Sequence, residues 1–400
     1  MLKCLMADLI KILIAFIIIL ILLRKKIHVG IVMLISAISL ILLYKMSWFS
    51  LKITVQNFIS DPVIIKLTFA LSFIRMFELI LREHNVLSDM MDTIKNIFRS
   101  KKIVTVSMPL LIGLVPSVGG AYFSAPMVEE ATRNTGISPE EKGFINYWFR
   151  HPWEYILPLY PGLLLASAIT KIELHNLITA NLIYAVLVVI TGFLFAMHDL
   201  KGFTISDKKF SLKGLWSFIP LTAVLLLVVI FHVELHYTLL AAVIFLLIFY
   251  RYSLRNILKV IRHGFSLDMI LLILGVMFFK DVIESSGAVK NLSNFFLQEG
   301  IPVLPLLFIL PFVTGLLTGL TLGFVGSTFP IILSIAGHSV SDISFAFSAG
   351  FLGVLLSPVH ICLVLTREYF KADIGGIYKM MAPGCLIIFG VSILQYFFTH

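Results

Sequence analysis

The sequence predicts an all-α polytopic membrane protein with about ten transmembrane helices in two inverted repeats. Two observations lead to this prediction. The 400-residue chain is 59% hydrophobic and only 13% charged, whereas about a quarter of the residues in a soluble domain are charged. In addition, a pattern of short apolar runs and breaks at residues 101–170 returns at 301–367. Each copy is expected to form a re-entrant hairpin followed by a broken transmembrane helix.

The two copies are recognised by matched prolines and glycines. In the first copy, the break at 116–120 separates two apolar runs that are too short to span a bilayer. The Gly- and Thr-rich break at 318–323 takes the same place in the second copy. Further along, HPWEYILPL at 151–159 aligns with SPVHICLVL at 357–365. Proline removes a backbone donor and disrupts the preceding turn, so helix breaks are predicted at Pro116, Pro152 and Pro358.

Apolar runs of roughly 18 residues are long enough to cross a bilayer. The expected spans are 8–23, 28–46, 62–81, 140–170, 175–198, 214–232, 235–250, 266–285, 341–366 and 379–398. The expected hairpins are 103–134 and 303–337. Charged segments with a partly apolar stripe are predicted to lie in the membrane interface, and these are 48–58, 85–99, 251–264 and 289–297.

The domain organisation follows from the repeat. The first repeat is predicted to occupy residues 1–198, with scaffold helices at 1–100 and the hairpin and broken helix at 101–170. A polar, basic segment at 199–213 is predicted to be a cytoplasmic linker. The second repeat is predicted to occupy residues 214–400, with scaffold helices at 214–300 and the second hairpin and broken helix at 301–367.

Basic residues predict the orientation. When each hairpin enters and leaves on one side, most Lys and Arg fall in the loops of one side, which is then cytoplasmic. Both termini of this multi-pass cell-membrane protein are therefore predicted to be extracytoplasmic. About five crossings per repeat place the second repeat upside down relative to the first, as in many secondary transporters. The alternative is a duplication that serves stability alone.

The hairpin breaks are candidate binding elements. Unpaired backbone within a bilayer is tolerated only where it is buried in protein or lines a cavity. Glycine lets a ligand approach the backbone closely, and the breaks also supply hydroxyl groups. The predicted substrate-binding residues are Ser117, Gly119, Gly120, Arg150, Thr318, Thr321, Gly323, Ser327, Thr328 and Ser357. The alternative is ordinary packing of small residues between helices.

Ionisable residues surround the predicted helix breaks. Arg150 presents a fork that suits a carboxylate or a phosphate. Glu154, His360 and His151 are predicted to bind the coupling ion, because ionisable groups at membrane depth are costly and therefore functional candidates. Two alternatives stay open: Arg150 and Glu154 neutralise each other on one helix face, or His151 makes only a structural hydrogen bond.

Other polar residues are given structural roles. Glu78 and Asp281 are repeat counterparts near the ends of their spans, and each is expected to pair with a nearby base, Arg75 or Lys280. Ligation of the coupling ion is the lesser alternative for these two acids. The three cysteines have no ligand spacing and are interpreted as small apolar residues. No metal, no cofactor and no enzyme activity are predicted, and there is no P-loop.

Three runs of the sequence resemble a known family. GLVPSVGGAYFSAPMVEEA at 113–131, FINYWFRHPWEYILPLYPG at 144–162 and SPVHICLVLTREYF at 357–370 resemble the domain-of-unknown-function 401 family of integral membrane proteins. That family looks like a branch of the ion-transporter superfamily of gluconate, citrate and dicarboxylate transporters and sodium/proton antiporters. The resemblance implies re-entrant hairpins, a scaffold domain and an elevator-like transport domain, often in a homodimer. The Ser-Asn-Thr hairpin tips of sodium-coupled dicarboxylate relatives are absent, so sodium coupling is not carried over.

The sequence therefore predicts a secondary active transporter that moves a small anion, an organic carboxylate, by elevator-like alternating access with proton coupling. The expected partners are the anionic solute, a coupling ion (proton or sodium), the lipid bilayer and a second copy of the chain, with no nucleic acid. A cation/proton antiporter is the first alternative. A membrane enzyme or assembly factor that transports nothing is the second.

Overall fold

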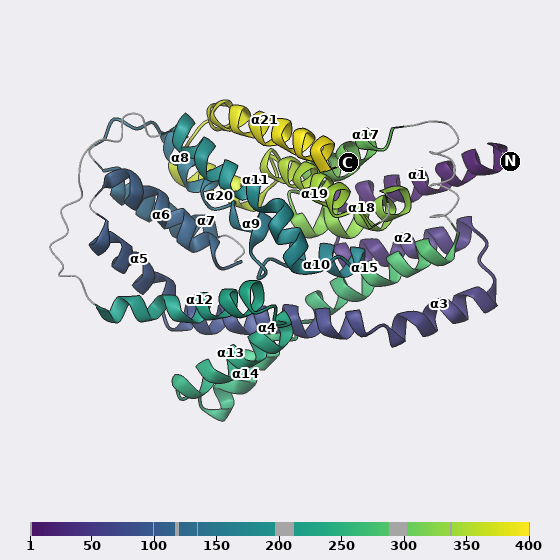
Figure 1. Ribbon diagram of the computed structural model, residues 1–400, viewed down its shortest axis with the longest axis horizontal. Helices are drawn as coiled ribbons and strands as arrows, with labels where there is room; N and C mark the ends of the chain where they lie inside the picture. Colours follow the sequence, from purple (N-terminus) through teal and green to yellow (C-terminus); the bar gives the residue numbers. More distant parts are fainter. Residues whose placement is uncertain are drawn as a thin grey trace.

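The computed structural model describes residues 2–98, 100–116, 120–133, 135–196, 212–287, 302–336 and 338–399. Within these ranges the chain forms helices joined by turns and loops, and it contains no β-strand (Figure 1). The all-α class predicted from the sequence is confirmed for this part of the chain. The expected interfacial segment 289–297 lies outside the described residues.

The first hundred residues form long helices near the predicted spans. They are α1 (Leu2–Arg24), α2 (Val29–Leu43), α3 (Trp48–Ser60), α4 (Pro62–Glu83) and α5 (Val86–Ile97). The start of α4 illustrates the local rules, since Pro62 occupies the first turn and the Asp61 carboxylate accepts from the Val63 N–H at 2.9 Å. The segments expected at 48–58 and 85–99 are helices α3 and α5.

The first hairpin and broken helix are a series of short helices. They are α6 (Lys101–Gly113), α7 (Gly120–Ala131), α8 (Pro139–Trp148), α9 (Trp153–Ile156) and α10 (Pro161–Thr170), and the long α11 (Leu174–Phe195) follows. The span expected at 140–170 is therefore three helices, because a proline lies at each new start and cannot continue the preceding hydrogen-bond ladder.

The second half of the chain has a similar order of elements. It starts with a 3₁₀ helix (Leu212–Phe218), α12 (Ile219–Leu225), a π-helix (Leu226–Ile230), α13 (Leu235–Phe249), α14 (Leu254–Gly264) and α15 (Leu267–Ser285). It continues with α17 (Leu304–Thr318), α18 (Thr321–Ala336), α19 (Val340–Leu355), α20 (Ile361–Phe370) and α21 (Ile374–Thr399). The broken helix expected at 341–366 is thus α19 and α20.

Among the described residues, two helices are long and apolar enough to cross a membrane, α11 and α21. The other clearly apolar helices have 10 to 17 residues. The predicted number of spans and the inverted orientation of the two halves stay predictions.

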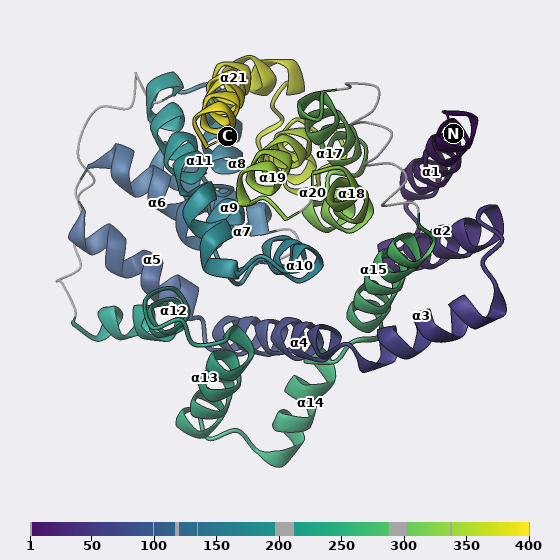
Figure 2. The ribbon, with the colours of Figure 1, turned by 45° about the vertical axis from the view of Figure 1, so that its right-hand side comes forward.

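The helices pack in two groups, which Figure 2 separates. Helices α6 to α11 lie beside α17 to α21, and α19 packs extensively on α17. The other group contains α2, α3, α4, α13 and α15, where α15 packs on α2 and α13 packs on α4. The largest fully buried side chains include Trp148, Tyr147, Tyr155 and Tyr184, so the core of the first group lies where α8, α9 and α11 meet.

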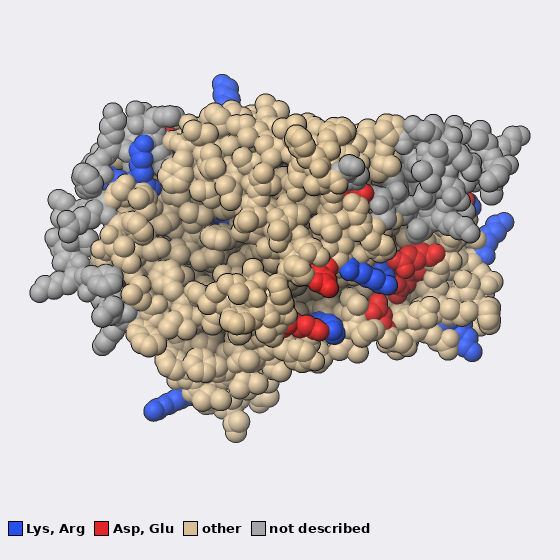
Figure 3. All heavy atoms as spheres, viewed as in Figure 1, with Lys and Arg blue, Asp and Glu red and all other residues tan. Residues whose placement is uncertain are grey.

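The surface is unusually apolar. Large side chains such as Leu42, Ile248 and Phe398 are 70%, 71% and 86% exposed. On the face shown in Figure 3, uncharged residues cover most of the area, while acidic and basic side chains gather near α3 and α15. Large apolar surfaces of this kind mark contact with a membrane or with another protein.

Close backbone contact joins α2 to α15. A Cβ atom added at Gly275 would clash with the backbone of Gly30, and one added at Gly30 would clash with the backbone of Leu271. Because backbone atoms block both positions, no side-chain rotation can make room for a methyl group. The two helices can therefore approach this closely only with glycine at the contact.

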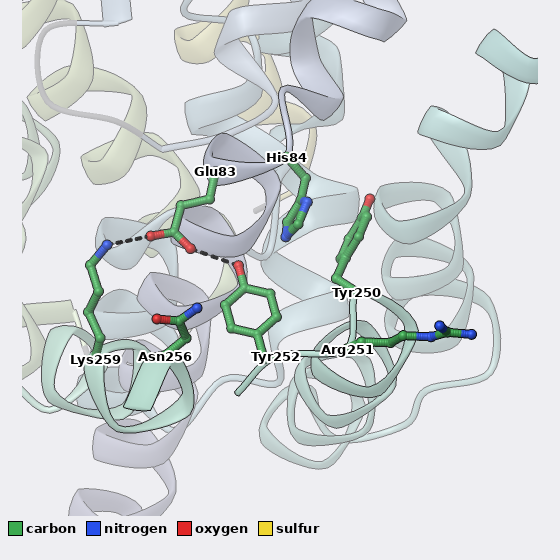
Figure 4. Close-up of a pocket in the computed structure, with 7 residues that line it drawn as sticks. All are labelled: Glu83, His84, Tyr250, Arg251, Tyr252, Asn256 and Lys259. Atoms are coloured by element: carbon green, nitrogen blue, oxygen red, sulfur yellow. Dashed lines mark hydrogen bonds and ion pairs between the residues drawn. The ribbon is translucent and has the colours of Figure 1, made fainter. Parts of the chain in front are cut away.

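A surface pocket of about 400 Å³ lies where α4 meets α13 and α14 (Figure 4). There the Glu83 carboxylate accepts from Lys259 Nζ and from the Tyr252 hydroxyl, both at 2.7 Å. The Lys259 ammonium, followed by the Tyr252 hydroxyl, lowers the pKa of Glu83 from its ordinary value. The His84 ring stacks on Tyr250 with centroids 3.6 Å apart. The pocket thus joins the loop after α4 to the loop between α13 and α14.

Replacing Gly275 by alanine is expected to destabilise the protein by about 1–3 kcal/mol, because the methyl group meets fixed backbone. The melting temperature of the detergent-solubilised protein measures the effect. Gly390→Ala in α21 is the matched control, since nothing lies within 4 Å of its added Cβ. Equal melting temperatures for Gly275→Ala and the wild type would contradict the close contact between α2 and α15.

Replacing Glu83 by glutamine is expected to lower the melting temperature at neutral pH, by an amount that vanishes in acid. The pKa of Glu83 is lowered in the folded state. The contribution of this ion pair to the free energy of unfolding is therefore complete above the unfolded pKa of about 4.3, and it is lost as the pH falls through the lower folded value. Melting curves from pH 7 down to pH 3 measure this convergence. Glu173→Gln, which alters a carboxylate with a 74% exposed side chain, is the control. A difference between Glu83→Gln and the wild type that persists unchanged in acid would contradict the ion pair as its source.

Candidate functional site

The candidate site lies where the interrupted helices meet. The turn that contains Pro152 separates α8 from α9, and the turn that contains Pro358 separates α19 from α20. These are two of the three helix breaks that the sequence predicts, and the third is at Pro116. The other two interruptions are the ends of the hairpin helices, at Pro116 between α6 and α7 and at Gly319 between α17 and α18.

His151 and His360 connect the two helix breaks. Their Nε2 atoms lie 3.2 Å apart. Nδ1 of His151 is 2.6 Å from the Tyr147 carbonyl oxygen, and Nδ1 of His360 is 2.7 Å from that of Gly319. Because a carbonyl oxygen only accepts, both Nδ1 atoms carry hydrogen, and the Nε2 atoms of two neutral rings are both acceptors. A proton or a metal ion bound between the two Nε2 atoms gives both acceptors a partner.

Gly319 connects the second hairpin to the second helix break. Its φ of +62° lies in the left-handed region that favours glycine. A Cβ atom there would lie 2.8 Å from the backbone of His360 and 3.0 Å from the Ser357 hydroxyl. Together with the hydrogen bond from His360 to its carbonyl, this close approach fixes the end of α17 against the turn before α20.

Glu154 connects the second hairpin to the first helix break. Thr321, the first residue of α18, donates its hydroxyl to Glu154 Oε2 at 2.8 Å. The other carboxylate oxygen, Oε1, lies 3.8 Å from Nε2 of His151. Among the described residues Glu154 and Arg150 form no ion pair within 4 Å, although the two charges still interact over a longer distance, so their mutual neutralisation stays an open alternative.

Arg150 connects the first hairpin to the first helix break. Its side chain is buried, with 3% of the residue exposed. A Cβ atom at Gly120 would clash with the Arg150 guanidinium, so the start of α7 lies directly against this charge. The predicted residues Ser117 and Gly119 lie outside the described residues. These contacts link all four interruptions, and the packing of α7 on α20 closes them into a ring.

A buried polar network supports this ring from one side. The Asn146 side chain donates to the Thr366 hydroxyl at 2.9 Å and to the Ala121 carbonyl at 3.0 Å, and it accepts from Ser124 at 2.6 Å. Asn146, Ser124 and Thr366 are each 0% exposed. The network ties α7, α8 and α20 together, and the sequence analysis did not predict it.

Cys362, interpreted from the sequence as a small apolar residue, lies beside the two histidines of the site. The ligand atoms of His151, His360 and Cys362 all lie within 4.8 Å of one another, and all three residues are buried. Arg150 is also within hydrogen-bonding reach of the Cys362 sulfur. The available signal was the spacing of His360 and Cys362, two residues apart at the start of α20.

Several predicted hydroxyl groups are used within their own helix. The hydroxyls of Thr318, Ser327 and Thr328 donate to the backbone carbonyls of Thr314, Gly323 and Phe324, respectively. Ser327 and Thr328 are fully buried. A Cβ atom at Gly323 would lie 2.9 Å from the Thr318 hydroxyl. These residues line the second hairpin, and only Thr321 directs its hydroxyl to another break.

Glu78 and Asp281 lie away from this ring and contact bases. Glu78 is 3.4 Å from Arg82 and 3.9 Å from His263. Asp281 is 3.4 Å from Lys280. The expected neighbour Lys280 is therefore observed, whereas Arg82 takes the place expected for Arg75.

The comparisons with known proteins are consistent with the resemblance noted in the sequence. No curated protein matches the chain. The wider resemblance to the ion-transporter superfamily stays a prediction. A family model described as protein of unknown function (DUF401) matches residues 7–397, and the chain therefore belongs to the DUF401 family.

Proposed function

We propose that this chain is a polytopic membrane protein and a secondary transporter of a small organic carboxylate. The observation that supports the proposal best is the ring of contacts among four helix interruptions around buried Arg150 and the His151–His360 pair. Secondary transporters commonly place substrate and coupling-ion sites at interrupted helices near the bilayer midplane. A fold maintained for stability alone has no evident need for buried charges at such breaks.

Several features support a location in the membrane. The chain is 59% hydrophobic, and large apolar side chains such as Phe398 are strongly exposed. Glu83 at the end of α4 and Lys259 in α14 form an ion pair between two segments, 82–102 and 251–262, that the distribution of basic residues assigns to the cytoplasmic side. We propose about ten crossings in two inverted repeats, with both termini outside the cytoplasm.

Arg150 is the proposed anchor for the anion. Its planar guanidinium matches the two oxygens of a carboxylate, and such bidentate pairs are among the stronger hydrogen-bonded contacts. The start of α7 at Gly120 lies directly against the guanidinium, so a carboxylate bound to Arg150 would also lie beside the backbone of the first hairpin. Ser357 and Thr321 supply hydroxyls from the second half of the chain.

The contacts also support an elevator-like motion. His151–His360, Thr321–Glu154 and Asn146–Thr366 each tie one half of the hairpin-containing group to the other. This group is therefore expected to move as one body. The helices of the second group, which include α4, α13 and α15, are the proposed scaffold and the surface for a homodimer.

The coupling cation is assigned to the same region. Glu154, His151 and His360 lie at the two helix breaks close to Arg150, and a cation held there offsets the charge of a bound carboxylate. This juxtaposition of sites makes the binding of anion and cation mutually favourable, as coupled transport requires.

A cation/proton antiporter is the second candidate. The observation that favours it is the approach of two imidazole nitrogens and a carboxylate, since His151, His360 and Glu154 form a set of cation ligands. In that case Arg150 has a structural role, and no carboxylate is carried.

The Arg150→Gln variant is expected to lower carboxylate binding and uptake by roughly 10- to 100-fold, because a charge-assisted contact contributes about 1.5–3 kcal/mol. Purified protein is first screened by melting temperature against mono-, di- and tricarboxylates and sugar acids, since a ligand of the folded state raises it. Uptake of the hits is then measured in liposomes, with pH and sodium gradients applied separately.

Arg75→Gln is the matched control, because Arg75 lies on α4 and donates to the His263 carbonyl, away from the ring. Loss of uptake in Arg150→Gln alone supports the carboxylate transporter. Cation exchange that persists in Arg150→Gln without any carboxylate effect points instead to the antiporter. If no solute moves along any gradient, the transport proposal is wrong.

A further inference from the structure

We infer that His151, His360 and Cys362 form a binding site for a thiophilic transition-metal ion of the Zn²⁺ class. Their ligand atoms lie within 4.8 Å of one another, and the three residues are only 0%, 8% and 8% exposed. The inference concerns ion binding by the folded chain and does not depend on the proposed transport.

The separation of the two imidazoles fits a shared metal ion. Zinc binds histidine nitrogen at about 2.0–2.1 Å in tetrahedral geometry, which places two such nitrogens roughly 3.3 Å apart. The Nε2 atoms of His151 and His360 are 3.2 Å apart. Zinc–sulfur bonds of about 2.3 Å require a nitrogen–sulfur separation of roughly 3.6 Å, so the Cys362 side chain has to move by about 1 Å at most to complete the set.

The backbone has already selected the metal-binding form of both rings. Each histidine directs Nδ1 at a carbonyl oxygen, that of Tyr147 or that of Gly319, which leaves both Nε2 atoms, 3.2 Å apart, available to bind a metal ion. Metal-ligating histidines typically make this second hydrogen bond, which fixes the tautomer and the ring orientation. Both carbonyls belong to interrupted helices, so the breaks themselves orient the two ligands.

The surrounding charges suit a divalent ion. A Cys362 thiolate and the Glu154 carboxylate, whose Oε1 is 3.8 Å from Nε2 of His151, together neutralise two positive charges, and Glu154 is placed to act as a fourth ligand. Arg150 lies within hydrogen-bonding reach of the Cys362 sulfur and stabilises the thiolate. Nitrogen and sulfur ligands select zinc-like ions over Mg²⁺ and Ca²⁺, which prefer oxygen.

Cobalt(II) binding to the full-length, tag-free protein in detergent tests the inference. A tetrahedral site with one thiolate gives intense visible d–d bands and a sulfur-to-cobalt charge-transfer band at one equivalent, and Zn²⁺ is expected to abolish both by displacement. Zn²⁺ is also expected to raise the melting temperature of the wild type by mass action.

Cys362→Ser is expected to lose the charge-transfer band and to bind Zn²⁺ roughly 100-fold or more weakly, since even the loss of outer-shell support costs 10- to 100-fold. Cys385→Ser is the matched control, because Cys385 is likewise a buried free cysteine but lies on α21, and it is expected to keep the band. Absence of the band in the wild type, or its retention in Cys362→Ser, would overturn the inference.

X-ray absorption at the zinc edge of the wild type keeps the test decisive if Cys362→Ser fails to fold. The inference predicts one sulfur neighbour at about 2.3 Å and two imidazole nitrogens at about 2.0 Å. A spectrum with only oxygen and nitrogen neighbours would assign the ion to another place on the protein and refute the site.

Discussion

The hydrogen-bonding needs of interrupted helices govern the interior of this protein. A helix that stops inside an apolar body leaves carbonyl oxygens without partners, and each one is costly unless another group donates to it. The structure meets this need with side chains from neighbouring helices and breaks. Five such carbonyls accept a hydrogen bond from a side chain. The pairs are Leu110 with Trp153, Gly113 with Tyr160, Gly319 with His360, Leu355 with Tyr147 and Leu356 with Tyr378. The breaks are therefore held together because each one supplies what another lacks.

This constraint also explains why charge and breaks coincide. Arg150 follows the end of α8, and His151 precedes the start of α9, so both side chains leave the chain where its backbone is already polar. His360 has the equivalent place before α20. A polar interior of this kind can hold an anion and a cation close together. The proposed coupling-cation site and the inferred metal site share His151, His360 and Glu154, but metal binding can be tested without any transport assay.

The features that follow from local chemistry could be predicted from the sequence. Proline acts on its own turn, so the breaks near Pro152 and Pro358 could be located before the structure was known. The hairpin helices likewise follow from short apolar runs on either side of glycine. Most helices begin and end within a few residues of the expected spans, because apolar composition and capping residues determine them locally.

The features that depend on tertiary contacts could not be predicted. The i,i+4 rule suggested that Arg150 and Glu154 neutralise each other, but α8 ends before Arg150, so the two side chains do not share a helix face. Cys362 meets His151 only through the fold, across more than half of the sequence. The buried hydroxyl of Ser327 bonds within its own helix, a choice of rotamer that composition does not reveal.

A disulfide cross-link between the second hairpin and the first broken helix tests the central claim, that the breaks of the two halves meet, most directly. A Cβ atom at Gly162 would lie 3.0 Å from the Thr321 Cβ, so the two positions have to move apart by about half an ångström to reach the roughly 3.5 Å at which disulfides begin to form. The Gly162→Cys, Thr321→Cys pair, in a chain whose native cysteines are serine, is expected to oxidise within one monomer and to lose two hydrogens by intact mass. Pairing Thr321→Cys with Gly390→Cys provides the control, which is expected to keep free thiols. Free thiols in the first pair under the same conditions would contradict the account.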